Sequence, residues 1–399
     1  MKITATGIII VFLLAFTAHT AYLIWNPDLP IPPDTIRHYD SIAGNMLAGK
    51  GYINIDGDTD CAVGPGYPLF LYSIYSVFGR DFIVVRFIQG IMHALSALCA
   101  VFLAWFTFKR WDRAFLAGSI VAVYPTLIYA SNLMLSETLF QFLFCVFVLL
   151  LIAAIQRENS FLFLSSGFVL ALATYTRSTS ILFPLAVGLY ILISKRLNKK
   201  IIFNYLLFCF TFFMLMSPWT LRNYLVTGKF IPTGIKGGFN FALGSSLEYL
   251  KPEVDARPLL SQDIKKCSDD GIIKREGKSE VAFDKYLWRL GWYNYKAAWL
   301  QNPTDVFRLL LYKAVRFWYA TTSGLHQRLI FFIQIPFLFV AILGFIAAIR
   351  RKQCPNEIWL GALVIVYFWG LFTLMFPLAR YSLPTIPFLA VFVSAFIRK

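Results

Sequence analysis

Charged residues are scarce in this chain of 399 residues: they make up 15% of it, whereas hydrophobic residues make up 58%. A soluble chain of this length folds as two or three domains and needs more charged side chains to cover their surfaces. The apolar residues also come in long blocks rather than at amphipathic spacing. These features argue against a soluble protein and predict a polytopic α-helical membrane protein.

Cysteine is also rare, with six residues and no C-x-x-C, H-E-x-x-H or clustered-histidine pattern. A structural zinc site is therefore not expected. Cys99, Cys145 and Cys209 fall within apolar blocks. Cys61 and Cys267 lie in external segments in the topology predicted below, so these two could pair in an oxidising compartment, although the sequence does not show that they meet.

Spanning a bilayer takes about 20 predominantly apolar residues, because only a helix satisfies its own backbone in hydrocarbon. We interpret the first apolar block as a span rather than a signal peptide, because it is long and lacks a small-residue cleavage site. Ten stretches qualify as predicted spans: 5–25, 83–108, 114–131, 139–155, 161–176, 179–194, 201–219, 329–349, 358–376 and 381–397.

The net charge of +16 is distributed in a way that fits a membrane better than a nucleic acid. Basic clusters fall on alternate loops, which is the positive-inside pattern. This pattern predicts the inner (cytoplasmic) membrane, both termini in the cytoplasm, and no nucleic-acid partner. The basic clusters lie at residues 109–113, 157, 195–200, 350–352 and 398–399.

Two predicted external segments, 26–82 and 220–328, are too long to be simple connections. They divide the chain into an N-terminal transmembrane module (1–219), an external region (220–328) and C-terminal helices (329–399). Residues 33–47 begin with a proline and place apolar side chains at helical spacing, which predicts an interfacial helix starting at Asp34. Residues 305–318 predict a second interfacial helix, with basic residues on one face and aromatic residues on the other.

Four charged residues lie at the external ends of predicted spans: Glu137, Arg177, Arg222 and Arg380. Each alone is explained as a helix end or a snorkelling anchor. Together, arginines at one membrane level suit a phosphate, because a guanidinium binds two phosphate oxygens with a fixed charge. An acid beside them suits activation of a hydroxyl nucleophile. The combination predicts chemistry on a lipid phosphate that carries a transferable group.

The order of short motifs along the chain is similar to that in a known family. The sequence resembles the GT-C glycosyltransferases of the protein-mannosyltransferase-like superfamily, which includes the aminoarabinose transferase acting on lipid A. The motifs that carry the resemblance are Asp34-x-x-Arg37-x-Tyr39, Gly64-Pro65-Gly66-Tyr67, Ser136-Glu137-Thr138, Pro218-Trp219-Thr220-Leu221-Arg222-Asn223-Tyr224, Gly237-Gly238-Phe239-Asn240 and Arg380-Tyr381-Ser382-Leu383-Pro384.

The resemblance implies an all-α GT-C fold with about ten transmembrane helices and external juxtamembrane helices. It also implies a polyprenyl-phosphate sugar donor, a glycan, lipid or protein acceptor among membrane lipids, and transfer on the external face with inversion. Asp34 maps onto the base and Glu137 onto an acidic position, while Arg222, Asn223 and Arg380 look like the residues that hold the donor phosphate. The other candidate substrate-binding residues are Arg37, Tyr39, Asp40, Asp60, Tyr67, Arg177, Asn240 and Tyr381.

Several alternatives stay open. Asp34 alone reads equally well as a helix N-cap. The position of Tyr39 differs by one from that in the aminoarabinose transferase, so Asp40 is an alternative base. Val63 and Gly64 stand where that relative has an acid before its proline-rich turn, which leaves Asp60 as the nearest acid.

Inversion needs only one carboxylate. Arginines can stabilise the leaving phosphate, so we expect no obligatory metal, with a divalent ion optional. Two other functions remain possible. An O-antigen ligase or polymerase also uses lipid-linked sugars, but such proteins typically depend on arginines of a large late loop rather than on an aspartate of an early loop. A lipid or sugar transporter would place charges or broken helices at mid-membrane, whereas the spans here are largely free of charge.

Overall fold

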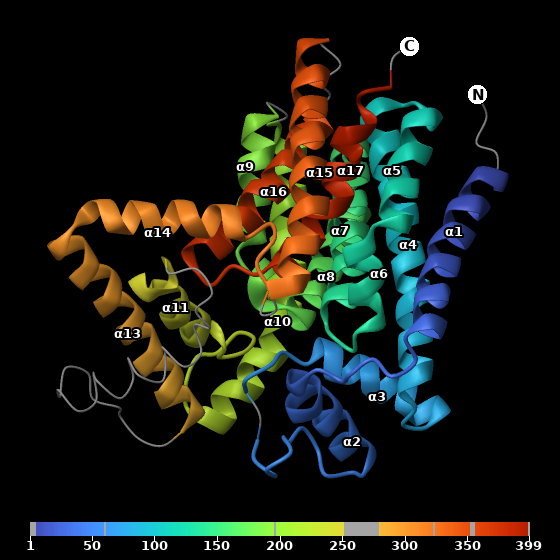
Figure 1. Cartoon of the computed structure of the whole chain (residues 1–399). Helices are drawn as coiled ribbons and strands as arrows, with labels where there is room; N and C mark the ends of the chain where they lie inside the picture. Colours follow the sequence, from blue (N-terminus) through green and yellow to red (C-terminus); the bar gives the residue numbers. More distant parts are fainter. Residues whose placement is uncertain are drawn as a thin grey trace.

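The computed structural model describes residues 5–59, 61–194, 197–250, 279–321, 324–351 and 356–397. Long helices form an upright bundle, and shorter elements gather at its lower end and along one side (Figure 1). The described ranges contain helices and no strand, which confirms the prediction of an all-α membrane protein. The first residues of α1 and the last of α17 lie at the same end of the bundle (Figure 1), as the predicted topology requires.

Among the residues that the structure describes, six helices are long and apolar enough to cross a membrane, and a seventh span forms if the bent pair α5 and α6 counts as one. This pair is bent by 50° at Tyr124–Pro125, where the proline removes a helix hydrogen bond. The six are α1 (Ala5–Trp25), α4 (Phe82–Phe108), α7 (Glu137–Arg157), α10 (Lys199–Thr227), α15 (Gly324–Arg350) and α16 (Asn356–Leu374); the bent pair is α5 (Trp111–Val123) and α6 (Pro125–Asn132).

All ten predicted stretches contain a helix, but the count of ten full spans is not confirmed. The other helices within these ten stretches are α8 (Ser160–Thr176), η2 (Ser178–Ser180), α9 (Phe183–Ile193), η4 (Ala379–Thr385) and α17 (Ile386–Ser394). Prolines at the first turns of α9 and α17 fix where these helices start, and 3₁₀ turns precede both.

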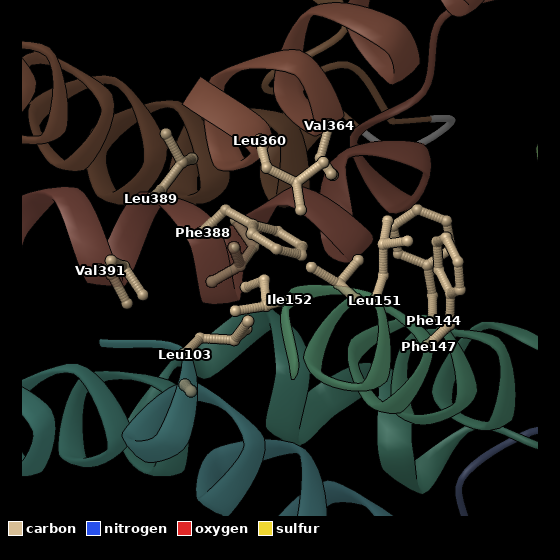
Figure 2. Close-up of a cluster of buried hydrophobic side chains, with 14 of the residues drawn as sticks. Leu103, Phe144, Phe147, Leu151, Ile152, Leu360, Val364, Phe388, Leu389 and Val391 are labelled. Atoms are coloured by element: carbon tan, nitrogen blue, oxygen red, sulfur yellow. The ribbon is translucent and has the colours of Figure 1, made fainter. Parts of the chain in front are cut away.

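Close packing of aromatic and branched side chains joins the helices of the bundle. Phe144 of α7 packs edge-on against Phe368 of α16. Leu103 of α4 and Ile152 of α7 face Phe388 of α17 (Figure 2). Lipid tails are as apolar as these side chains, so dispersion contacts rather than escape from water stabilise this core. The bundle is thus a fixed frame for the external elements.

The external elements form two groups. The predicted helix 33–47 is two elements: a short π-helix, η1 (Thr35–Asp40), followed by α2 (Ser41–Leu47). With α3 (Gly66–Phe78) they cover the lower end of the bundle (Figure 1). The second group is α11 (Gly237–Ser245), η3 (Leu247–Leu250), α13 (Glu280–Gln301) and α14 (Pro303–Arg316).

The second group has a small core of its own, with Leu243, Leu287 and Leu309 among its members. Its helix α14 confirms a helix in the predicted stretch 305–318. One detail of that prediction is wrong, because Lys313 lies on the buried face rather than among exposed basic residues.

Candidate active site

Asp34 lies at the start of η1, and its side chain is about half exposed. The N-cap alternative is not realised, because the carboxylate makes no capping hydrogen bond. Instead, Oδ1 of Asp34 lies 3.4 Å from Nζ of Lys236, the residue just before α11. The carboxylate is therefore free of the local backbone and available for chemistry.

The pKa of Asp34 lies below its usual value. Burial alone would raise it, but the positive charges of Lys236 and Arg380 and a hydrogen bond from Lys236 lower it. Asp34 is thus an ionised carboxylate at neutral pH. Because Arg380 acts on it through space, the carboxylate is also close to the arginine cluster described next.

Glu137, the first residue of α7, is buried between two arginines. Its Oε1 lies 2.7 Å from Nη1 of Arg177 and 3.7 Å from Nε of Arg380. Both guanidinium groups also lie over the ring of Tyr381, at 5.3 and 5.1 Å from its centroid. That ring stacks on Phe372 of α16 at 4.3 Å. We call Glu137, Arg177, Arg380 and Tyr381 the arginine cluster.

Two close approaches set the position of these groups. A Cβ on Gly66 would lie 2.6 Å from the backbone nitrogen of Thr176, so only glycine lets the Gly64–Gly66 turn pack against the residue before Arg177. The hydroxyl of Thr35 donates to the carbonyl of Met134. This bond ties the helix of Asp34 to the segment that leads into Glu137. Residues far apart in sequence are thus held in one site.

Arg222 and Asn223 belong to a different group of contacts. Nη1 of Arg222 donates to Oδ1 of Asn223 at 2.9 Å, and its guanidinium lies 4.7 Å from the ring centroid of Trp219. It also contacts Tyr52 and the thiol of Cys61. Asn223 is fully buried, and its amide donates to backbone carbonyls. These contacts join the two external segments, and they favour a structural role for the pair over phosphate binding.

Asp40 is buried, with its Oδ1 accepting from Tyr75 at 2.8 Å and from Nε of Arg80 at 3.0 Å. This occupied carboxylate favours Asp34 as the base. Tyr67 is fully buried as well: its hydroxyl donates to Gln89 at 2.7 Å, and its ring packs edge-on against Tyr39. Asp40 and Tyr39 of η1 and Tyr67 of α3 therefore belong to the packing that holds η1 against α3.

Replacing Asp40 by Asn should destabilise the protein without stopping the chemistry. The change removes the charge that holds Arg80, and we expect a loss of about 1–3 kcal/mol of stability. Thermal unfolding in detergent measures this, with the exposed Asp56→Asn as the matched control expected within about 0.5 kcal/mol. A transfer rate per folded molecule that drops a hundredfold or more, at unchanged melting temperature, would instead make Asp40 the base.

The remaining candidates are peripheral or lie outside the described ranges. Arg37 is exposed and pairs with Asp56 at 3.6 Å. The amide of Asn240 donates to the carbonyl of Lys236, a local contact at the start of α11. Asp60 and Cys267 lie outside the described residues, so the structure does not test whether Cys61 and Cys267 pair.

Sequence reasoning missed Lys236, the partner of Asp34. Its only local signal is its place directly before the Gly237-Gly238-Phe239-Asn240 motif. The contact with Asp34 joins residues 202 apart in sequence, so it becomes visible only in the folded chain. In the part of the chain that the structure describes, no three His, Cys, Asp or Glu side chains gather as metal ligands do.

The same arrangement of helices occurs in solved structures. The oligosaccharyltransferase AglB from Archaeoglobus fulgidus, in complex with an inhibitory peptide and a dolichol-phosphate, superposes with a TM-score of 0.60 at 12% identity. The match covers 97% of this chain and 50% of AglB, so the chain spans about half the length of that protein. The chain has the GT-C fold. The apo form of AglB agrees, with a TM-score of 0.59 at 13% identity and coverages of 97% and 50%.

Sequence comparison supports the same assignment for this GT-C chain. Residues 62–221 match the family described as dolichyl-phosphate-mannose-protein mannosyltransferase. ArnT from Cupriavidus metallidurans, bound to undecaprenyl phosphate, is similar at a TM-score of 0.47 and 13% identity, over 98% of this chain and 78% of ArnT. No curated protein sequence matches the chain. The family match of residues 62–221 and the fold shared with AglB confirm the predicted resemblance to GT-C glycosyltransferases, which are enzymes.

Proposed function

We propose that this chain is an inverting glycosyltransferase that moves a monosaccharide from a polyprenyl-phosphate donor to a hydroxyl group outside the cytoplasm. One observation carries the proposal: an ionised, half-exposed carboxylate, Asp34, lies within the electrostatic reach of an arginine cluster at one end of a membrane bundle. A base for the acceptor and cations for a leaving phosphate are the two groups that this reaction needs.

In the proposed reaction, Asp34 takes the proton of the acceptor hydroxyl as its oxygen attacks the anomeric carbon of the sugar. The bond between that carbon and the phosphate oxygen breaks, and its electron pair leaves with the polyprenyl phosphate. A single displacement of this kind inverts the anomeric carbon and needs one carboxylate. Arg177 and Arg380 stabilise the charge that grows on the leaving phosphate.

Lys236 and Glu137 adjust the charge of this site. Without a donor, Lys236 pairs with Asp34, and Glu137 offsets part of the charge of Arg177 and Arg380. A bound phosphate offers Lys236 a second anion within the same site, which lets it share its charge between Asp34 and the donor. This sharing raises the basicity of Asp34 at the moment when a base is required.

We place the protein in the inner (cytoplasmic) membrane, with both termini in the cytoplasm and the site on the opposite face. AglB, which shares the fold, has been solved with a dolichol-phosphate and a peptide. A lipid-linked donor fits this chain as well, because Arg177 directly follows α8 and Arg380 lies in η4, shortly after α16. The acceptor class, whether glycan, lipid or protein, follows from the assay below.

The experiment is sugar transfer by the purified chain in liposomes, with polyprenyl-phosphate sugars as donors and candidate acceptors in turn. We expect a product of inverted anomeric configuration, read by NMR couplings. Retained configuration, or turnover with lipid-pyrophosphate oligosaccharides alone, would contradict the mechanism and favour a ligase-like enzyme. Movement of labelled lipid across the bilayer without product would favour a transporter.

We further propose that the reaction needs no metal, because arginines and Lys236 can supply the positive charge. Transfer in excess chelator should therefore match the untreated rate within about twofold. Loss of transfer in chelator, with recovery on addition of Mg²⁺ or Mn²⁺, would contradict this part of the proposal alone.

A further inference from the structure

Lys313 of α14 is completely buried, and its ammonium group contacts no carboxylate among the described residues. It shares the buried face of α14 with Val306 and Leu309, where helical spacing calls for an apolar residue. Burial lowers the pKa of Lys313 to about 7, so the fold bears a cost in keeping an amine there. The hydrogen bonds of the Lys313 ammonium group offset this cost.

The three N–H bonds of this ammonium meet three acceptors. Nζ of Lys313 lies 2.9 Å from the carbonyl of Gly244, 3.0 Å from the carbonyl of Leu374 and 2.8 Å from the hydroxyl of Tyr295. Gly244 is the second-last residue of α11, and Leu374 is the last residue of α16. Carbonyls at helix ends lack partners within the helix and carry partial negative charge. One cation thus satisfies two helix ends at once.

The two helix ends approach so closely that a side chain would not fit between them. A Cβ on Gly244 would lie 2.1 Å from the carbonyl oxygen of Met375 and 3.1 Å from Nζ of Lys313. Two further bonds fasten the same region: Trp369 of α16 donates to the carbonyl of Ala314, and the backbone of Ala379 donates to that of Ala320. The contact is therefore a built junction between α11, α14 and α16.

Two of the three joined helices, α11 and α16, each lie next to one half of the site. α11 follows directly on Lys236, the partner of Asp34, and its nine residues form a rod about 13 Å long. Its other end is also held, since Asp284 of α13 accepts from the backbone N–H of Gly238 at 2.8 Å. α16 contributes Phe372 beneath Tyr381 and leads into η4, which carries Arg380.

From this junction we infer that Lys313 is a positioning residue: by joining the ends of α11 and α16, it sets the spacing between the Asp34–Lys236 pair and the arginine cluster. The inference rests on the proposed function for its consequence in catalysis. The junction itself follows from the contacts alone. Lys313 touches neither the proposed base nor the arginines, so its effect is on geometry.

The test compares Lys313→Met, which keeps an unbranched side chain one atom shorter and removes its charge, with the exposed Lys296→Met on α13 as the matched control. We expect kcat of Lys313→Met to fall about 10- to 100-fold, because a displacement of about 1 Å costs that much. KM for the donor and the stoichiometry of bound polyprenyl phosphate should stay within about twofold. Lys296→Met should match the wild type.

Two further measurements separate positioning from loss of fold. Propylammonium should restore part of the activity of Lys313→Ala, because it replaces the missing atoms, whereas propanol should not. Hydrogen exchange of residues 236–245 and 375–385 should rise in Lys313→Met and not in Lys296→Met. If hydrogen exchange of these residues is unchanged in Lys313→Met, the inference is overturned, whether or not the wild type transfers sugar. If the wild type transfers no sugar, that result alone contradicts only the proposed function. The inference is also overturned if Lys313→Met has the kcat of the wild type. It is overturned as well if the loss of activity equals the loss of folded protein that binds the donor.

Discussion

Asp34→Asn should lower kcat for sugar transfer by about 10²–10⁴-fold, which is the usual contribution of a general base. The change keeps the size of the side chain and removes its ability to take a proton. Because Asp34 makes no capping hydrogen bond and is half exposed, we expect the melting temperature and the binding of polyprenyl phosphate to stay unchanged. Steady-state transfer rates, normalised to bound polyprenyl phosphate, measure the effect.

The pH profile offers a second reading of the same residue. Since the pKa of Asp34 is lowered, the base stays ionised at pH values where a free carboxyl would be protonated, and transfer should decline only below that range. Lys236→Met removes a positive charge, so the acid limb should move to higher pH. An acid limb at the same pH in both proteins, or wild-type transfer by Asp34→Asn, would exclude Asp34 as the base.

Arg380→Gln should lower kcat/KM by about 10²–10³-fold, since it removes one donor aimed at a developing negative charge. The fold should survive, because Glu137 keeps its 2.7 Å contact with Arg177. The loss should fall mainly on kcat if the interaction strengthens as the phosphate leaves, and on KM if the arginine only binds the donor. Kinetics at saturating acceptor, with donor concentration varied, distinguish the two.

Arg222→Gln is the control for Arg380→Gln. Arg222 contacts Tyr52, Cys61 and Asn223, so its loss should reduce the melting temperature while the rate per folded molecule changes by less than about tenfold. A reversed order, with Arg222→Gln the slower enzyme at unchanged stability, would return the phosphate to Arg222. The family resemblance alone assigns the phosphate to both Arg222 and Arg380, and so predicts a large loss of transfer in both variants.

Much of the fold could be predicted from the sequence because hydrocarbon imposes a simple rule on the backbone. Long apolar blocks and alternating basic loops place residues at one face or the other. This is why Asp34, Glu137 and Arg380 could be assigned to one membrane level before their contacts were known. The rule fixes depth and says nothing of lateral position. Arg222 shares the predicted level, yet its contacts are with another group of residues.

What the sequence could not show depends on contacts between distant segments. Asp40 was an alternative base in the sequence, but its carboxylate is occupied by Arg80 and Tyr75. Lys313 followed the expected pattern of a basic face, and only the meeting of two helix ends explains its burial. In both cases the partner lies in another element, so local spacing carries no signal of it.

The site draws on η1, α7, α8, α11 and η4, and the last of these follows α16, the final long span. A membrane protein enters the bilayer progressively as it is synthesised. The proposed base and its lysine are then in place before Arg380 has been inserted. In the proposed mechanism, a chain that has not yet inserted η4 therefore lacks one of the two arginines that stabilise the leaving phosphate.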